Sequence, residues 1–195
     1  MISCILFNVT LEVLMMEDIT ILIGAQAGQG LNVVENILVQ YIKKNNYYIY
    51  SSKEYMSRVR GGINTLTLII SNKRKKAIKR DVDIVFTISK GVLEWCEKEG
   101  RLNNNTLVVG EDKYLQDKIS MEVNKLVIDL EKTVKELGDK RYLNVLIAGV
   151  LSSILNTKKE LITDVLENVF KGKGNNVIEG NKQAFYKGID IGKDI

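Results

Sequence analysis

The chain has 195 residues, a formal net charge of +4 and neither histidine nor proline, a length that suits one domain burying about 70% of its unfolded surface. The small basic excess does not predict nucleic-acid binding, and without histidine the chain cannot supply a Ser-His-Asp triad or a histidine metal site. Its two distant cysteines, Cys4 and Cys96, cannot complete an iron–sulfur cluster or a zinc site, and the lack of a disulfide framework favours the cytoplasm.

Residues 1–16 form an apolar start that lacks the features of a targeting segment. The stretch has no basic start and no small-residue cleavage site, and it is too short to span a bilayer. Either the gene start is over-extended, with Met15 or Met16 as the true initiator, or the stretch is an extra strand or helix. We therefore expect an N-terminal extension over residues 1–16 and a single domain over residues 17–195.

A glycine-rich turn, Gly24-Ala25-Gln26-Ala27-Gly28-Gln29-Gly30, separates a predicted strand from a predicted helix. Apolar residues run continuously over 19–23, and they recur at three- and four-residue spacing over 31–42. Glycine adopts positive φ easily and has no Cβ that would block a ligand or another backbone. The N–H groups of such a turn, placed before a helix, can bind an anion.

The spacing of these glycines matches neither of the common phosphate-binding motifs. No Lys-Ser or Lys-Thr pair follows, as a Walker A motif requires, and Val33 stands where G-x-G-x-x-G has its third glycine. The turn fits the looser pattern G-x-x-x-G-x-G of some dinucleotide enzymes. However, the strand predicted over 47–51 is followed by Ser52 and Lys53 where a nicotinamide-binding fold offers an acid, and Glu54 is only close to that place. A phosphate-bearing ligand and a purely structural turn both fit this pattern.

Two polar stretches after the second predicted strand are rich in arginine or lysine. In the first, Arg58 and Arg60 precede Gly61-Gly62, which places fixed cations beside exposed amides and suits a carboxylate, a phosphate or an acidic loop of another subunit. A structural corner held by salt bridges is the alternative. In the second, residues 72–80, six of nine side chains are Lys or Arg, which indicates a solvated hairpin loop or a contact for a phosphate tail or an acidic protein.

The rest of the chain alternates between predicted strands and helices. Strands are expected at 63–71, 82–88, 107–109 and 125–128, and helices at 90–98, 142–157, 158–170 and 176–188. This rhythm predicts an α/β fold, a Rossmann-like three-layer sandwich with a mostly parallel sheet. The uncharged helix over 142–157 is expected to be buried centrally, to form part of a subunit interface, or both.

The order of these motifs resembles the gamma module of the 2-oxoacid:ferredoxin oxidoreductases, in the form that is fused to the alpha subunit in 2-oxoglutarate-type enzymes. The resemblance covers roughly Asp18 to the C-terminus. It rests on the glycine turn, Lys53-Glu54-Tyr55, Ser57-Arg58-Val59-Arg60-Gly61-Gly62 with Asn64, Asp83-Ile84-Val85, Tyr142 to Gly149, and Asn181-Lys182-Gln183-Ala184-Phe185 with Gly188.

The resemblance implies one subunit of a cytoplasmic hetero-oligomer that converts pyruvate, 2-oxoglutarate or another 2-oxo acid and coenzyme A to an acyl-CoA, with reduction of ferredoxin. Thiamine diphosphate and iron–sulfur clusters are then expected on the partner alpha and beta chains, so this chain is inert alone and binds neither nucleic acid nor a membrane. The resemblance implies no catalytic and no metal-binding residue here, but a wall for coenzyme A. The residues expected to contact it are Gly24, Gln26, Ala27, Gly28, Gln29, Gly30, Ser57, Arg58, Arg60, Gly61, Gly62 and Asn64.

One residue departs from the family motif to which the resemblance refers. Two other classes of function also remain open. Relatives often carry histidine after the Gly-Gly pair, where this chain has Ile63, so a polar contact made there is lost. A short-chain-dehydrogenase-like, NAD(P)-dependent oxidoreductase is the first alternative, because Tyr114 lies four residues before Lys118 and resembles that family's Tyr-x-x-x-Lys. No serine stands at a suitable distance upstream. A non-catalytic nucleotide- or coenzyme-binding module is the second alternative.

Overall fold

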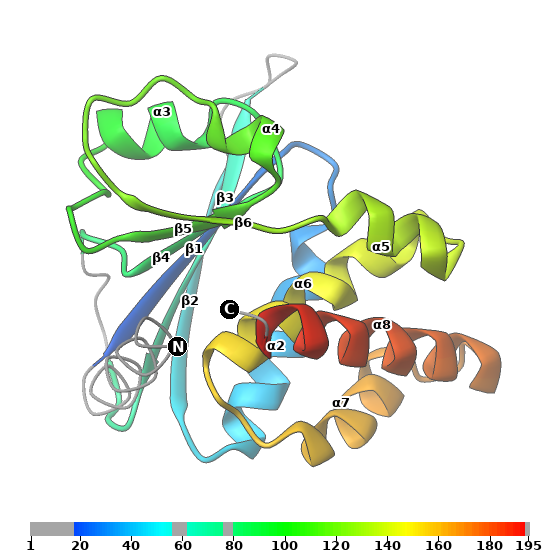
Figure 1. The fold of residues 1–195 in the computed structure, drawn as a ribbon. Helices are drawn as coiled ribbons and strands as arrows, with labels where there is room; N and C mark the ends of the chain where they lie inside the picture. Colours follow the sequence, from blue (N-terminus) through cyan, green and yellow to red (C-terminus); the bar gives the residue numbers. More distant parts are fainter. Residues whose placement is uncertain (1–17, 56–61, 76–79, 194–195) are drawn as a thin grey trace. The chain divides into compact units, whose positions relative to one another are not determined.

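A computed structural model describes residues 18–55, 62–75 and 80–193. These residues fall into two compact units, which Figure 1 draws in one view. The sheet unit contains residues 18–31 and 49–129, and the helical unit contains residues 32–48 together with those from 130 onward. The predicted extension over residues 1–16 lies outside the described residues, and a single domain over 17–195 stays a prediction.

The sheet has six strands in the order β2-β3-β1-β4-β5-β6. The strands are β1 (Ile19–Gln26), β2 (Tyr48–Tyr55), β3 (Ile63–Ser71), β4 (Ile84–Thr87), β5 (Leu107–Gly110) and β6 (Asn124–Val127). The pairs β1–β4, β4–β5 and β5–β6 are parallel, whereas β3 runs antiparallel to β1. The predicted α/β fold with a mostly parallel sheet is therefore confirmed.

The strand order corrects one sequence-based interpretation. If residues 72–80 were a hairpin loop, β3 and β4 would be hydrogen-bonded neighbours. Instead β1 lies between them, so β3 and β4 do not form a hairpin. Lys75 forms an ion pair with Asp18, the residue that precedes β1.

Apolar side chains of β1, β4 and β5 face two helices of the same unit, α3 (Val92–Lys98) and α4 (Asp112–Leu115). The contact between β1 and α3 is close at Gly24, because a Cβ there would collide with Cγ1 of Val92. The neighbour that excludes a Cβ at this glycine is thus a side chain, not the ligand or second backbone that the sequence suggested. The core on this face is formed by Leu22, Ile63, Val82, Val85, Val92, Leu93, Cys96, Leu102, Val108 and Leu115.

Cys96 is a buried core residue rather than a nucleophile. Burial raises the pKa of its thiol to about 12. Because only the thiolate reacts with iodoacetamide, Cys96 in a Cys4→Ser variant should resist alkylation at about pH 8 and react once urea unfolds the chain. Labelling of Cys96 in native buffer would contradict its assignment to the core.

The raised pKa of the Cys96 thiol also predicts that the stability of the fold decreases as the pH rises from 9.0 towards about 12, because the thiol of the unfolded chain loses its proton at a lower pH than the buried thiol does.

The helical unit consists of α2 (Leu31–Lys44) after its first residue, α5 (Leu130–Leu137), α6 (Leu143–Ile154), α7 (Ile162–Val169) and α8 (Asn175–Lys193). Helix α6 is buried over Val145–Ser152, which confirms the burial expected of this uncharged stretch. It crosses α8 where Gly149 meets Gly188, and a Cβ on either glycine would collide with a backbone carbonyl of the other helix. Tyr41 of α2 packs edge-on against Phe185 of α8, with ring centroids 5.4 Å apart.

The C-terminal end of α2 follows from local sequence. Lys43 and Lys44 complement the negative end of the helix dipole, and Asn46 adopts a left-handed conformation at φ 66° that ends the helix. No helix among the described residues has the length and apolar character needed to cross a membrane.

Candidate functional site

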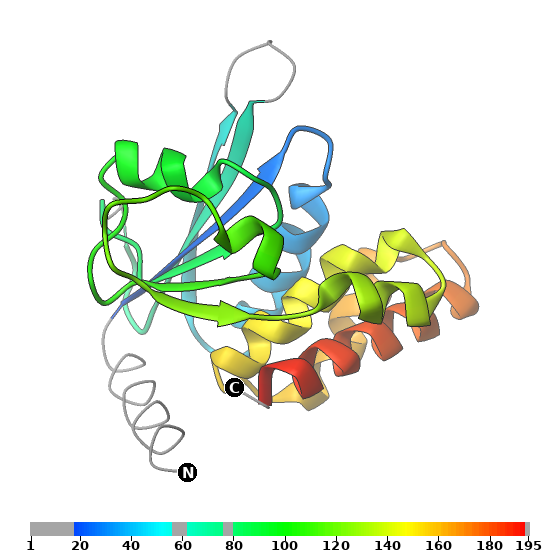
Figure 2. The same cartoon turned by 45° about the horizontal axis from the view of Figure 1, so that its top comes forward.

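The glycine turn and the start of β3, which follows Gly62, meet at one end of the sheet. In the register of the β1–β3 pair, Asn64 lies opposite Ala25, and Ile63 lies opposite Gln26. Figure 2 shows the turn after β1, in blue, at the end of the sheet where β3 begins. The structure therefore places Gly62 and Asn64 beside the predicted turn, in the same unit.

The remaining predicted contacts fall into two groups. Gly24, Gln26, Ala27, Gly28, Gln29 and Gly30 occupy the end of β1 and the turn that follows it. Ser57, Arg58, Arg60 and Gly61 lie outside the described residues. A role in coenzyme binding stays a prediction for all of these residues.

Two glycines of the turn adopt conformations that favour glycine. Gly28 has φ 92° and Gly30 has φ 78°, and the N–H of Gln29 donates to the carbonyl of Gln26 at 3.3 Å. No atom lies within 4 Å of a Cβ built on Gly28, so the space beside it is open. The expectation of positive φ holds for Gly28 and Gly30, while Gly24 belongs to β1 and is needed for its contact with Val92.

Ser89, just beyond β4, stabilises the glycine turn through hydrogen bonds of its hydroxyl group. The sequence analysis did not predict this role. Its Oγ accepts a hydrogen bond from the N–H of Gln26 at 2.8 Å and donates to Oε1 of Gln29 at 2.7 Å. The same Oε1 accepts from the N–H of Gln26 at 3.0 Å. The contact joins residues 60 positions apart, so no local pattern could reveal it; only the parallel pairing of β1 with β4 brings them together.

The exposed surface of the turn carries donors. The N–H groups of Ala27, Gly28 and Gly30 have no acceptor among the residues the structure describes, and no carboxylate of those residues bonds to the turn. Ala27 and Gly28 are exposed. Successive free N–H groups near positive-φ residues form a concave anion-binding surface, so the chemistry here suits phosphate or carboxylate oxygens.

The start of α3 is not available for the same purpose. The Asp117 carboxylate accepts from the N–H of Gly91 at 2.9 and 3.0 Å and from that of Leu93 at 3.1 Å. These are the amides that would otherwise point at a ligand. These N–H groups are therefore not free to bind an anion.

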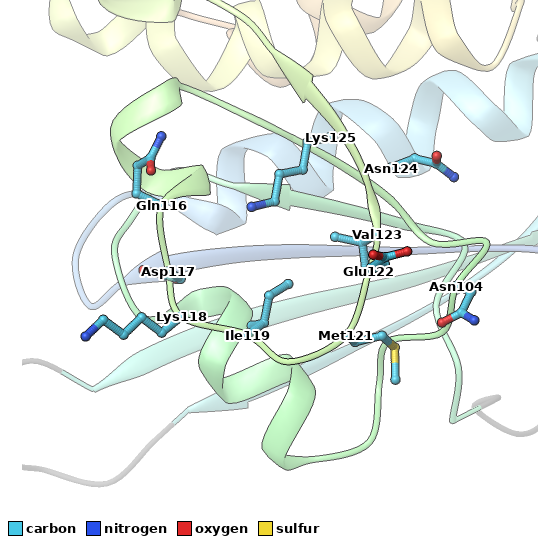
Figure 3. Close-up of a pocket in the computed structure, with 10 residues that line it drawn as sticks. All are labelled: Asn104, Gln116, Asp117, Lys118, Ile119, Met121, Glu122, Val123, Asn124 and Lys125. Atoms are coloured by element: carbon cyan, nitrogen blue, oxygen red, sulfur yellow. The ribbon is translucent and has the colours of Figure 1, made fainter.

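A hollow of about 760 Å³ lies elsewhere in the sheet unit, under the loop that joins α4 to β6 (Figure 3). It is lined by Asn104, Gln116, Asp117, Lys118, Ile119, Met121, Glu122, Val123, Asn124 and Lys125. The Lys125 ammonium donates to the carbonyl of Leu115 at 2.8 Å, and carboxylates of α3 accept from the loop's backbone. None of the residues predicted to contact coenzyme A lines this hollow.

The structure disfavours the dehydrogenase alternative. Two side chains four residues apart share one helix face only if the helix continues past both. Helix α4 ends at Leu115, so Lys118 lies in the loop after it and does not follow Tyr114 on a helix. The predicted strand over 47–51 also continues to Tyr55, which places Glu54 inside β2 rather than after it. In the described part of the chain, no group of three or more Cys, Asp or Glu side chains could hold a metal ion.

Ile63, the residue after Gly62 where the resemblance led us to expect histidine, is a core residue here. It is 7% exposed and belongs to the apolar cluster under α3. Its Cδ1 lies 3.8 Å from a Cβ built on Gly91. An apolar residue thus suits the packing at this position.

Comparisons with known proteins point to one family. The model of the family described as pyruvate ferredoxin/flavodoxin oxidoreductase matches residues 20–191. The alpha subunit of a 2-oxoacid:ferredoxin oxidoreductase from a Sulfolobus species is 34% identical over 65 residues, which are 33% of this chain and 10% of that protein. The chain thus covers about a tenth of the length of such curated relatives.

Two solved structures share the fold over most of this chain. The 2-oxoglutarate:ferredoxin oxidoreductase from Magnetococcus marinus, solved with 2-oxoglutarate, coenzyme A and succinyl-CoA bound, gives a TM-score of 0.80 at 21% identity, covering 92% of this chain and 32% of that chain. The gamma subunit of a keto/oxoacid ferredoxin oxidoreductase from Geobacter sulfurreducens gives a TM-score of 0.72 at 16% identity, covering 91% of this chain and 99% of that chain.

Proposed function

Because the chain belongs to the pyruvate ferredoxin/flavodoxin oxidoreductase family, we propose that it serves as the gamma subunit of a cytoplasmic 2-oxoacid:ferredoxin oxidoreductase. The assembled enzyme would decarboxylate a 2-oxo acid such as pyruvate or 2-oxoglutarate, form an acyl-CoA and pass electrons to ferredoxin. This chain would help assembly and form the wall of the active site on the coenzyme A side. Alone it would be inactive.

The side chains present in this chain indicate which subunits would hold the cofactors. The chain has no histidine and two distant cysteines, so it lacks the ligands for an iron–sulfur cluster. The clusters and thiamine diphosphate would therefore be held by alpha and beta chains. The likeness to nearly the whole of a separate gamma subunit supports this arrangement.

One observation carries the coenzyme A assignment: the β1–β3 register sets Asn64 opposite Ala25. The donor-rich turn and the end of the Gly-Gly motif then share one end of the sheet. Coenzyme A carries a diphosphate and a ribose phosphate, and backbone N–H groups bind such anionic oxygens well. Arg58 and Arg60, six and four residues before Asn64 in the sequence, would add charge at the same place.

Co-purification from the native cell tests the subunit role. A tagged chain should bring down alpha and beta chains, and the complex should reduce ferredoxin only when a 2-oxo acid and coenzyme A are both supplied.

The double variant Arg58→Ala with Arg60→Ala should weaken assembly or raise the KM for coenzyme A by about tenfold or more, because charge-assisted hydrogen bonds are lost.

A matched control removes two exposed cations from the other end of the sheet, as Lys73→Ala with Arg74→Ala. This variant should assemble and bind coenzyme A normally. A chain that emerges alone at every salt concentration would refute the subunit role. If the control weakens coenzyme A binding as much as the arginine variant, the location of the site is wrong.

A further inference from the structure

We propose that Ser89 is a positioning residue that turns the side-chain amide of Gln29 so that its Nε2 group donates to an anionic oxygen of the coenzyme. The inference rests on the proposed function. Neither Ser89 nor the end of β4 was among the residues expected to form the site. The proposal is argued from the hydrogen bonds around the N–H of Gln26.

The first step fixes the orientation of the Gln29 amide. The backbone N–H of Gln26 can only donate, so the Gln29 atom 3.0 Å from it has to be the oxygen. Ser89 accepts from the same N–H at 2.8 Å, and its own proton then points to Oε1 of Gln29 at 2.7 Å. With the oxygen held by two donors, the two Nε2 protons face away from β4.

The second step is the rigidity of Ser89. The residue is 3% exposed, and its carbonyl accepts from Oγ1 of Thr87 at 2.9 Å. The N–H of Ile88 donates to the carbonyl of Gly24 at 3.1 Å, which ties this end of β4 to β1. A buried hydroxyl on a fixed strand end is a better support for a half-exposed amide than a loop residue.

The third step is the chemistry that the oriented amide offers. Nε2 of Gln29 has no acceptor among the described residues, and it lies on a turn whose exposed N–H groups at Ala27 and Gly28 are also without acceptors there. A surface that carries several donors without acceptors favours anionic oxygen over a cation or a donor-rich ligand. The phosphate groups of coenzyme A meet this requirement.

The assembled enzyme tests the proposal through Ser89→Ala. The KM for coenzyme A should rise about tenfold with kcat unchanged, since a donor to a charged group is lost from its bound position. Ser89→Thr keeps the hydroxyl and should restore most of the affinity. Ser120→Ala is the matched control, because it also removes one serine hydrogen bond, to Glu97, in the same unit. The control should leave KM unchanged.

A second variant and a direct readout keep the test decisive if Ser89→Ala does not fold. Gln29→Leu, on the exposed turn, should raise KM to a similar extent, and the double variant should be no worse than the worse single one, because both act through the same amide. In the wild-type chain alone, coenzyme A or inorganic phosphate should shift the NMR signal of the Gln29 side-chain amide.

The outcomes separate the two proposals. A wild-type complex without coenzyme A-dependent activity would overturn the proposed function, while the amide shift with inorganic phosphate would still support Gln29 as an anion donor. An active complex in which Ser89→Ala lowers kcat and thermal stability but not coenzyme A affinity would overturn the inference and leave the function standing. Additive effects of the two substitutions would overturn it as well.

Discussion

Gly149→Ala is expected to destabilise the helical unit by about 3 kcal/mol or to prevent its folding, as overpacking at a tight contact does. Alanine normally favours a helix over glycine by about 1 kcal/mol, so propensity alone predicts the opposite sign. At Gly149, however, the new Cβ would collide with the carbonyl oxygen of Phe185 and lie 3.0 Å from Cα of Gly188. These are backbone atoms of a 19-residue helix, and they cannot turn aside as a side chain can. The clash therefore outweighs the gain in propensity.

Gly180→Ala on α8 is the matched control for this prediction. A Cβ there meets only the hydroxyl end of Tyr142, a half-buried side chain that can rotate. The control should stay within about 1 kcal/mol of wild type because the gain in helix propensity offsets the small shift. Urea denaturation followed by circular dichroism measures both variants. Equal midpoints for Gly149→Ala and wild type would contradict the packing of α6 on α8.

The sequence predicted the long elements well because their patterns are local. Helix α2 begins at the predicted Leu31, and β3 matches the predicted range of 63–71, since period and β-branched content decide these elements. Helix α4 has four residues, and α5 is short and largely polar, so neither was predicted. Brief or polar segments take their structure mainly from tertiary contacts, which no window of sequence contains.

In the candidate site too, the sequence predicted the local features but not the contacts between distant residues. The glycine turn was recognisable because positive φ and a missing Cβ are requirements on single residues. The roles of Gly24 and Gly28 nevertheless differ: Val92 excludes a Cβ at Gly24, while Gly28 has open space and a φ of 92°. Ser89 could not be predicted, because its partner is set by which strand pairs with β1. Strand order is a long-range property, and it also decided against a β3–β4 hairpin.

Gln29→Glu is expected to raise the KM for coenzyme A about a hundredfold, through loss of a donor and gain of a like charge. The substitution conserves shape. One carboxylate oxygen can still accept from the N–H of Gln26 and from the Ser89 hydroxyl, as Oε1 does now. Only the outward atom changes, from a donor to an anionic oxygen. The turn should therefore keep its conformation while its outer surface repels phosphate.

Salt dependence separates this explanation from a loss of structure. Repulsion between exposed charges is screened at higher ionic strength, so the KM of Gln29→Glu should fall towards that of Gln29→Leu as salt is added, while wild-type KM should rise. Gln183→Glu, which makes the same charge change at an exposed position of α8, should leave both KM and its salt dependence as in wild type. If Gln29→Glu bound coenzyme A normally, Nε2 of Gln29 would not face the phosphates, and the reason for Ser89 to hold the amide would disappear with it.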